Sequence, residues 1–124
     1  MANIIPDAFK SELLSGTHNF ANGGNTFKIA LFTDISGYST SSTAYSTTNE
    51  VSSSGTNYSA GGNALDSQAV SVASNTALVD FADEVFSSVT LSAVGAVIYN
   101  DTNSDKLVVV LDFGGTKTAT NGDF

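Results

Sequence analysis

Residues 94–113 read VGAVIYNDTNSDKLVVVLDF. Within this stretch, two apolar runs at 94–99 and 106–113 are separated by the polar segment at 100–105. The run at 107–111 has no polar alternation, which is typical of a core strand or of a strand covered on both faces. Because Asn, Asp and Ser are ordinary turn formers, the stretch predicts two strands joined by a turn.

The rest of the chain predicts further strands and a mainly β fold. Apolar residues alternate with a period of two at 27–33 and 77–81, and the segments 69–73 and 85–91 also indicate strands. Strands are therefore expected mostly in 27–33 and 64–113, with Gly114 and Gly115 ending the last of them. We expect one domain over residues 1–124, built as an antiparallel β-sandwich or a small barrel, because stacked or closed sheets protect strand edges.

One short N-terminal helix is predicted at about residues 6–15. Pro6 suits the first turn of a helix, where its missing N–H would have no partner in any case. Phe9 and Leu13 are four residues apart and share one helix face, which Leu14 widens. This face forms an apolar stripe that either packs on the protein's own sheet or docks on a partner.

Residues 34–63 are rich in Ser, Thr, Gly and Asn and predict loops, with a short strand near 45–51. Three of the four tyrosines, Tyr38, Tyr45 and Tyr58, lie in this segment. They either anchor the loops to the sheet or form a contact surface, since tyrosine is favoured at interfaces.

The composition argues against an enzyme. The chain has no Cys, no Trp, one His and four basic residues, all lysine, against 18 Ser and 14 Thr. Catalysis needs titratable or nucleophilic groups gathered in a pocket, and few such groups are present. Without cysteine there is no disulfide and no thiolate metal site.

The net charge of −8 argues against two classes of partner. Binding to nucleic acid depends on Lys and Arg, and the four lysines are dispersed. The same charge opposes binding to an anionic membrane surface, and no run approaches the ~20 apolar residues of a membrane helix. We therefore expect neither nucleic acid nor membrane as a partner.

Two acidic segments have residue spacings that could form a metal-binding or a catalytic site. Asp101, Asn103 and Asp105 match the opening of a calcium loop, but Lys106 stands where glycine should make the turn. The acids at 80–84 could form a catalytic carboxylate pair, although a strand end followed by a solvated turn is the stronger interpretation. We predict turns at both places.

The single histidine, His18, follows the predicted helix. No Gly-x-Ser-x-Gly motif marks a serine for it to activate, and one histidine cannot make a multi-histidine zinc site. We expect His18 to close the helix end by bonding backbone carbonyls. The sequence therefore predicts no catalytic, cofactor-binding or metal-binding residue.

Near the last residue, Asn121-Gly122 is a strong hairpin signal. A hairpin turn needs a strand after it, and only Asp123 and Phe124 follow. We expect either that the natural chain continues beyond Phe124 or that a partner supplies the missing strand.

Six segments, in this order and spacing, resemble small virion structural proteins of tailed bacteriophages. They are FKSELLSGTHNF (9–20), FKIALFT (27–33), YSAGG (58–62), VDFAD (79–83), GAVIYN (95–100) and VLDFGG (110–115). Such proteins usually continue past the Asn-Gly turn with another strand. Where their pattern often has Trp, this chain has Phe86.

The resemblance implies a virion component that is assembled in the bacterial host cytoplasm. The first hypothesis is a capsid decoration (cement) protein that bridges subunits of the major capsid protein. The alternative is a tail or fibre module that contacts the host surface. Both kinds of protein are often homo-oligomers, trimers among them, and no family active site carries over.

The candidate interface combines the apolar N-terminal residues with the loop tyrosines. Its members are Ile4, Ile5, Phe9, Leu13, Leu14, Tyr38, Tyr45 and Tyr58.

Overall fold

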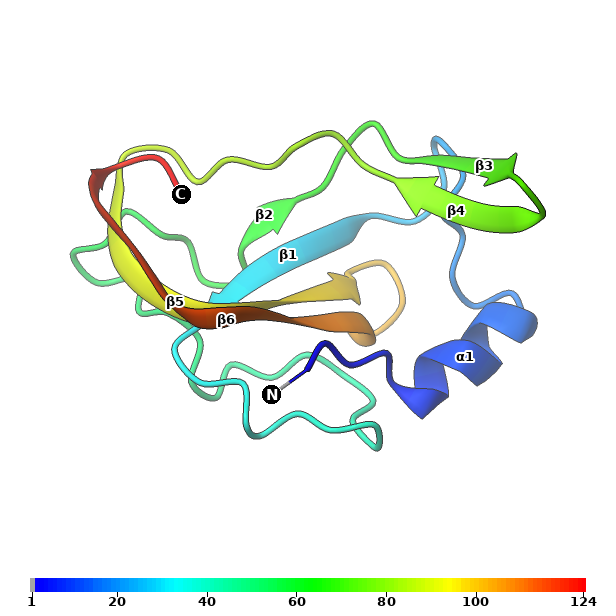
Figure 1. Ribbon diagram of the computed structural model, residues 1–124, viewed down its shortest axis with the longest axis horizontal. Helices are drawn as coiled ribbons and strands as arrows, with labels where there is room; N and C mark the ends of the chain where they lie inside the picture. Colours follow the sequence, from blue (N-terminus) through cyan, green and yellow to red (C-terminus); the bar gives the residue numbers. More distant parts are fainter. Residues whose placement is uncertain (1) are drawn as a thin grey trace.

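The computed structural model describes residues 2–124 (Figure 1). Its elements are α1 (Asp7–Leu14), β1 (Phe27–Phe32), β2 (Asn63–Ala64), β3 (Ala69–Ala73), β4 (Thr76–Asp80), β5 (Val89–Asn100) and β6 (Lys106–Gly122). The fold is mainly β with antiparallel sheets and one short helix, as predicted. The helix lies within the predicted range and begins directly after Pro6.

A four-stranded sheet with the order β2-β1-β5-β6 forms the centre of the molecule. Its longest pairing joins β5 to β6, and the turn between them is the predicted polar segment at 100–105. Within the described residues, this sheet does not close into a barrel, and its two covered faces make the fold sandwich-like. The predicted strands at 27–33, 94–99 and 106–113 are therefore confirmed as the core of the sheet.

Both faces of this sheet are covered, and strand alternation decides which side chain faces which cover. Leu31 pairs with Ala96, and both belong to an apolar cluster with Val51 and Phe86. Their neighbours along the strands point the opposite way, into a second cluster built around Phe32. The layer that packs on each face of the sheet consists mainly of loops. These hydroxyl-rich segments take the place that a second sheet has in a regular sandwich.

The β5–β6 ribbon bends sharply at one end (Figure 1). Between the pairs Ala93–Lys117 and Gly95–Asp112, residues 113–116 of β6 oppose a single residue of β5. This bulge contains Gly114, whose φ of +75° is a conformation that glycine adopts at little cost. The prediction that Gly114 and Gly115 end the strand was therefore wrong, because the pair bends a strand that continues to Gly122.

Asn121-Gly122 makes no hairpin turn. Asn121 has a positive φ, but it lies inside β6, and Gly122 still pairs with Val89. Phe124 then exchanges both backbone hydrogen bonds with Phe86, at 2.9 and 3.0 Å. Residues 122–124 thus run antiparallel to residues 86–89 of the same chain. The Asn-Gly sequence therefore makes a bulge in β6 instead of a hairpin turn.

The N-terminal residues are tied to the outer edge of β6. Ile4 and Val110 exchange two backbone hydrogen bonds, of 2.9 and 2.8 Å, and the side chain of Asn3 accepts from the backbone N–H of Asp112. These bonds satisfy part of an edge that would otherwise present unpaired backbone groups. They also place α1 beside the β5–β6 turn.

Candidate docking surface

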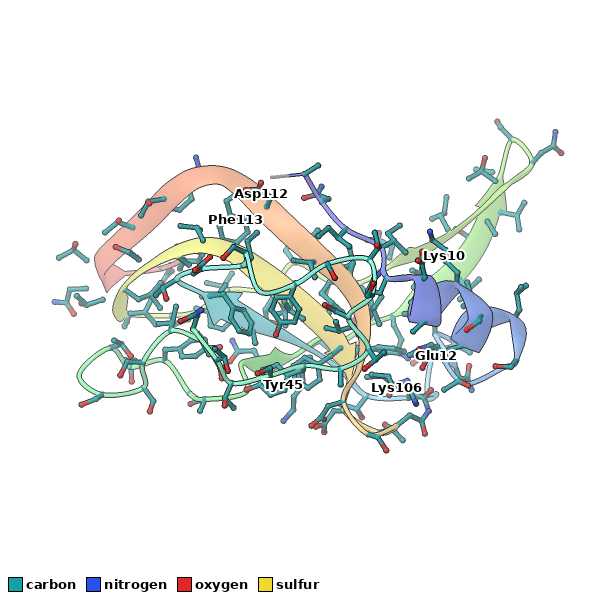
Figure 2. The ribbon with its side chains drawn as sticks, turned by 90° about the horizontal axis from the view of Figure 1, so that it is seen from below. Lys10, Glu12, Tyr45, Lys106, Asp112 and Phe113 are labelled. Atoms are coloured by element: carbon teal, nitrogen blue, oxygen red, sulfur yellow. The ribbon has the colours of Figure 1, made fainter. Side chains whose placement is uncertain are left out.

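A two-stranded hairpin of β3 and β4, which we call the arm, projects from one end of the molecule (Figures 1 and 2). Its strands pair only with each other over five residue pairs, from Ala69–Asp80 to Ala73–Thr76. The turn at its tip is Ser74-Asn75, and both residues have positive φ, as in a type I′ turn. Every residue of both strands is exposed.

One face of the arm is entirely apolar. Val70 pairs with Val79 and Val72 with Ala77, and cross-strand partners share a face in an antiparallel pair. Val70 is 56% exposed and Val72 is 73% exposed. An isolated two-stranded hairpin is marginally stable in water, so an apolar hairpin that packs on nothing is costly for a monomer to keep. Exposed apolar surface of this kind marks an interaction site.

The end of α1 adds apolar surface at the same end of the molecule (Figure 1). Leu13 is 46% exposed and Leu14 is 91% exposed. The helix and the base of the arm are joined by aromatic contacts, in which Phe20 lies between Phe9 and Phe81 with ring centroids 6.1 and 6.4 Å away. The candidate docking surface therefore consists of the arm and the helix end, held by a common aromatic cluster.

The predicted N-terminal apolar stripe is divided: some of its residues pack on the protein's own sheet, and others belong to the candidate docking surface. Ile4 packs on the Phe32 cluster and Phe9 on the Phe20 cluster, so these two side chains help to hold the helix to the protein's own sheet. Ile5, Leu13 and Leu14 remain exposed. The stripe therefore contributes its helix end to the candidate surface, and its other members serve the fold.

The loop tyrosines point inward. Tyr38 and Tyr58 are buried, and Tyr45 is partly buried and stacks on Tyr99 at 4.3 Å. Tyr38 bonds the backbone of Ser46 through both its donor and its acceptor capacity. The contact-surface interpretation of Tyr38 and Tyr58 is thus corrected, because buried rings that are bonded to their own loop have no surface to offer a partner.

The anchor for these tyrosines is the carboxylate of Glu50, which the sequence analysis did not single out. The hydroxyls of Tyr45 and Tyr58 donate to its two oxygens at 2.5 and 2.6 Å, and the backbone N–H of Gly61 donates to it at 2.7 Å. The Tyr58 hydroxyl also accepts from the backbone N–H of Leu31 in the sheet. Glu50 is the single acidic residue between Asp34 and Asp66, a stretch rich in Ser and Thr, and this was the signal that could have indicated its role.

Burial raises the pKa of Tyr45 and Tyr58, and their hydrogen bonds to Glu50 raise it further. Burial is also the main reason why the pKa values of Tyr38 and Tyr99 are raised. All four tyrosines of the chain are therefore neutral hydrogen-bond donors: Tyr38, Tyr45 and Tyr58 donate within the 34–63 segment, and Tyr99 donates from β5 to the carbonyl of Gly61.

His18 is buried and does not bond backbone carbonyls, so the helix-closing prediction was wrong. The side-chain oxygen of Asn100 accepts from the backbone N–H groups of Thr102 and Asn103, which turns its amide nitrogen toward Nδ1 of His18. Nδ1 must therefore accept, and Nε2 carries the proton and donates to Glu12 at 3.1 Å. The ring serves as a link between α1 and the β5–β6 turn.

A lysine completes this link from the other side of Glu12. Nζ of Lys106 lies 3.1 Å from the second carboxylate oxygen of Glu12, as Figure 2 shows where the helix meets the start of β6. Lys10 similarly lies 3.2 Å from Asp7, and Lys28 lies 3.8 Å from Asp101. Three of the four lysines thus face a carboxylate of the same chain.

The two acidic groups that were weighed as sites form local structure. Residues 101–105 are turn, as predicted, and Asp80 accepts from the adjacent backbone N–H of Phe81. Glu84 accepts from the amide of Asn63 at 2.8 Å. Across residues 2–124, no three His, Asp or Glu side chains are placed to hold a metal ion.

No helix among residues 2–124 has the length and apolarity required to cross a bilayer. Comparison with protein family models, with curated proteins and with solved structures finds no match to this chain.

Proposed function

We propose that this chain is a bacteriophage virion structural protein, and that it acts as a capsid decoration protein that bridges neighbouring subunits of the shell. The observation that carries the proposal is the arm, a fully exposed hairpin with an apolar face of Val70, Val72, Ala77 and Val79. The resemblance of six segments to phage virion proteins supports it. The protein would act through contact and not through bond chemistry.

The small free energy that one arm can contribute to binding favours a role in a repeating assembly. Completing the burial of a half-exposed valine contributes roughly 1 kcal/mol, so Val70, Val72 and Val79 on the apolar face together contribute about 3 kcal/mol. That energy alone corresponds to a Kd weaker than about 1 mM, before any cost of ordering. A single arm is thus a weak ligand, and a shell that engages many copies can make such contacts useful through multivalency.

The internal hydrogen bonds support the same role. Glu50 and the tyrosines hold the long loops on the sheet, and the His18 link holds the helix on the β5–β6 turn. Glu50, His18 and the tyrosines are titratable side chains of the kind that catalysis uses. Here they are engaged in hydrogen bonds that keep the body of the protein rigid. A rigid body loses little conformational entropy when it binds.

Copy number in purified particles tests the proposal. For a phage that encodes this chain, quantitative mass spectrometry of particles should give hundreds of copies, and a cryo-EM map should show them on the shell. A few copies at the tail would support a tail or fibre module instead. Absence from washed particles would contradict any virion role.

The helix end can be tested on shells that lack the protein. Leu13→Asp should leave a folded, soluble protein, because Leu13 is nearly half exposed, and should reduce binding to shells. Ser11→Asp is the matched control, since it adds the same charge at an exposed position of the same helix. Equal binding by both variants would remove the helix end from the docking surface.

A further inference from the structure

We propose that the arm binds a different protein by strand addition, and that the added strand alternates apolar residues with Lys or Arg. This inference deepens the proposed function, on which it rests, by naming the chemistry of the partner. It draws on the unpaired edges of the arm, on the alternation of its two faces and on the distribution of charge.

The arm offers two strand edges. Within the described residues β3 and β4 pair only with each other, so each strand has an outer edge whose backbone groups are unpaired. A third strand would satisfy one edge and bring the hairpin to the size at which small sheets become stable. Main-chain bonds along an exposed edge are a recurring way to recognise an extended segment.

The side-chain pattern of the arm specifies the pattern of such a strand. Val70, Val72 and Val79 lie on one face, whereas Asp80, paired with Ala69, lies on the other. A third strand with apolar residues at alternate positions would extend the apolar face. At the outer edge of β4, its remaining side chains would lie beside Leu78 and Asp80 on the other face, where the stem of a Lys or Arg can cover Leu78 and its charge can meet Asp80.

The base of the arm strengthens the preference for cations. Asp66 and Asp83 are exposed beside Asp80, since the backbone N–H of Ala82 bonds the carbonyl of Asp66 and joins the two segments. Residues 29–105 contain no Lys and no Arg. The arm and its base therefore carry carboxylates and no cation of their own, which complements a basic partner and repels an acidic one.

A second copy of this chain does not meet these requirements. Lys10, Lys28 and Lys106 each lie within 4 Å of a carboxylate of their own chain. The remaining lysine, Lys117, is a single cation between threonines in the edge strand β6, and this strand does not alternate apolar residues with Lys or Arg. Another copy would bring its own net charge of −8 to the acidic base of the arm. The partner is thus a different protein.

A pair of synthetic peptides tests this chemistry with the purified full chain. The probe is a fluorescent octapeptide of alternating valine and lysine, and the matched control replaces each lysine by glutamate. Fluorescence anisotropy should show that the lysine peptide binds at least about tenfold more tightly, with affinity that falls as salt rises from about 0.02 M to about 0.5 M. Amide shifts in NMR spectra should be confined to the arm and its base.

Three changes separate strand addition from general attraction between opposite charges. Val70→Thr combined with Val72→Thr should weaken binding about tenfold, whereas Val85→Thr, at an exposed valine outside the arm, should leave it unchanged. Asp80→Asn should weaken binding, whereas Asp34→Asn, at an exposed carboxylate outside the arm, should not. A lysine peptide that is N-methylated at every residue should not bind, because it has no backbone N–H left to donate to the edge of the arm.

Several results would overturn the inference. These are equal binding of the lysine and glutamate peptides, no binding of either, equal effects of the arm and control variants, or unchanged binding after N-methylation. Reversible dimerisation of the wild type in sedimentation that Val72→Thr abolishes would assign the arm to a second copy instead. Because no virion is used, a negative peptide result leaves the particle test of the proposed function intact, and the reverse also holds.

Discussion

The side-chain amide of Asn100 donates a hydrogen bond of 3.0 Å to Nδ1 of His18, a residue 82 positions earlier in the chain. The same amide donates to Asn25, whose side-chain oxygen also accepts from the backbone N–H of Asn19 and from the amide of Asn103. Asn100 is completely buried. One side chain thus joins the segment after the helix, the loop before β1 and the β5–β6 turn.

Replacement of Asn100 by alanine should lower the free energy of unfolding by about 3 kcal/mol or more, because buried donors and acceptors lose their partners. Urea denaturation followed by circular dichroism measures the change. Asn22→Ala, at an exposed loop position, is the control and should change stability by less than about 0.5 kcal/mol. Similar stability of the two variants would show that the network around Asn100 contributes little.

Alkaline pH should unfold the protein, and the tyrosines should ionise together with unfolding. Their pKa values are raised in the folded chain above the usual value of 10.0, mainly by burial. Their contribution to stability is therefore complete below pH 10 and is lost as the pH rises further. A titration should show tyrosinate absorbance and loss of circular dichroism in one transition. Tyrosines that ionise near pH 10 in a folded chain would contradict this.

Gly62→Ala should prevent stable folding. Gly62 has a φ of +77°, and a Cβ there would lie 1.8 Å from the backbone oxygen of Ile29. Gly55 has a similar φ of +72° with nothing within 4 Å of an added Cβ, so Gly55→Ala should cost only about 1–2 kcal/mol of backbone strain. Thermal unfolding of both variants separates the two effects. Equal losses would mean that the close approach to β1 is unimportant.

The arm should exchange its amide hydrogens much faster than the central sheet. Its strands contact only each other and are exposed throughout, whereas Val97 in β5 is fully buried between β1 and β6. Local opening of the arm therefore needs far less free energy than global unfolding. Hydrogen exchange followed by NMR should give low protection at 70–79 and protection near the global limit at 96–98. Comparable protection would show that the arm is held by contacts beyond its own pairing.

Local pattern explains why several elements could be predicted. Alternation at 27–32, the apolar run at 107–111 and the polar turn between β5 and β6 all depend on residues that are close in sequence. The short strand predicted near 45–51 exists only as isolated bridges at Ala44 and Glu50, because the segment bonds the sheet at single points. The predicted strand at 85–91 begins only at Val89, after a stretch that pairs with the end of the chain.

The candidate site was predicted only in part, for a related reason. Leu13 and Leu14 are exposed on the helix end, but the same stripe gives Phe9 to an internal cluster. The sequence shows strands at 69–73 and 77–81 but not that they would stand away from the sheet. In the structure β1 and β5 each pair with other strands on both sides, so neither offers an edge to the hairpin.

By itself, the sequence determined the mainly β class, the helix after Pro6 and the strands on either side of the 100–105 turn, because strand period, proline geometry and turn chemistry act over a few residues. Only the tertiary structure decided that Tyr38 and Tyr58 point inward, that the Gly114 region bends a strand instead of ending it, and that the arm keeps an apolar face in solvent. Each of these depends on contacts between residues far apart in the chain, and composition and period carry no information about such contacts.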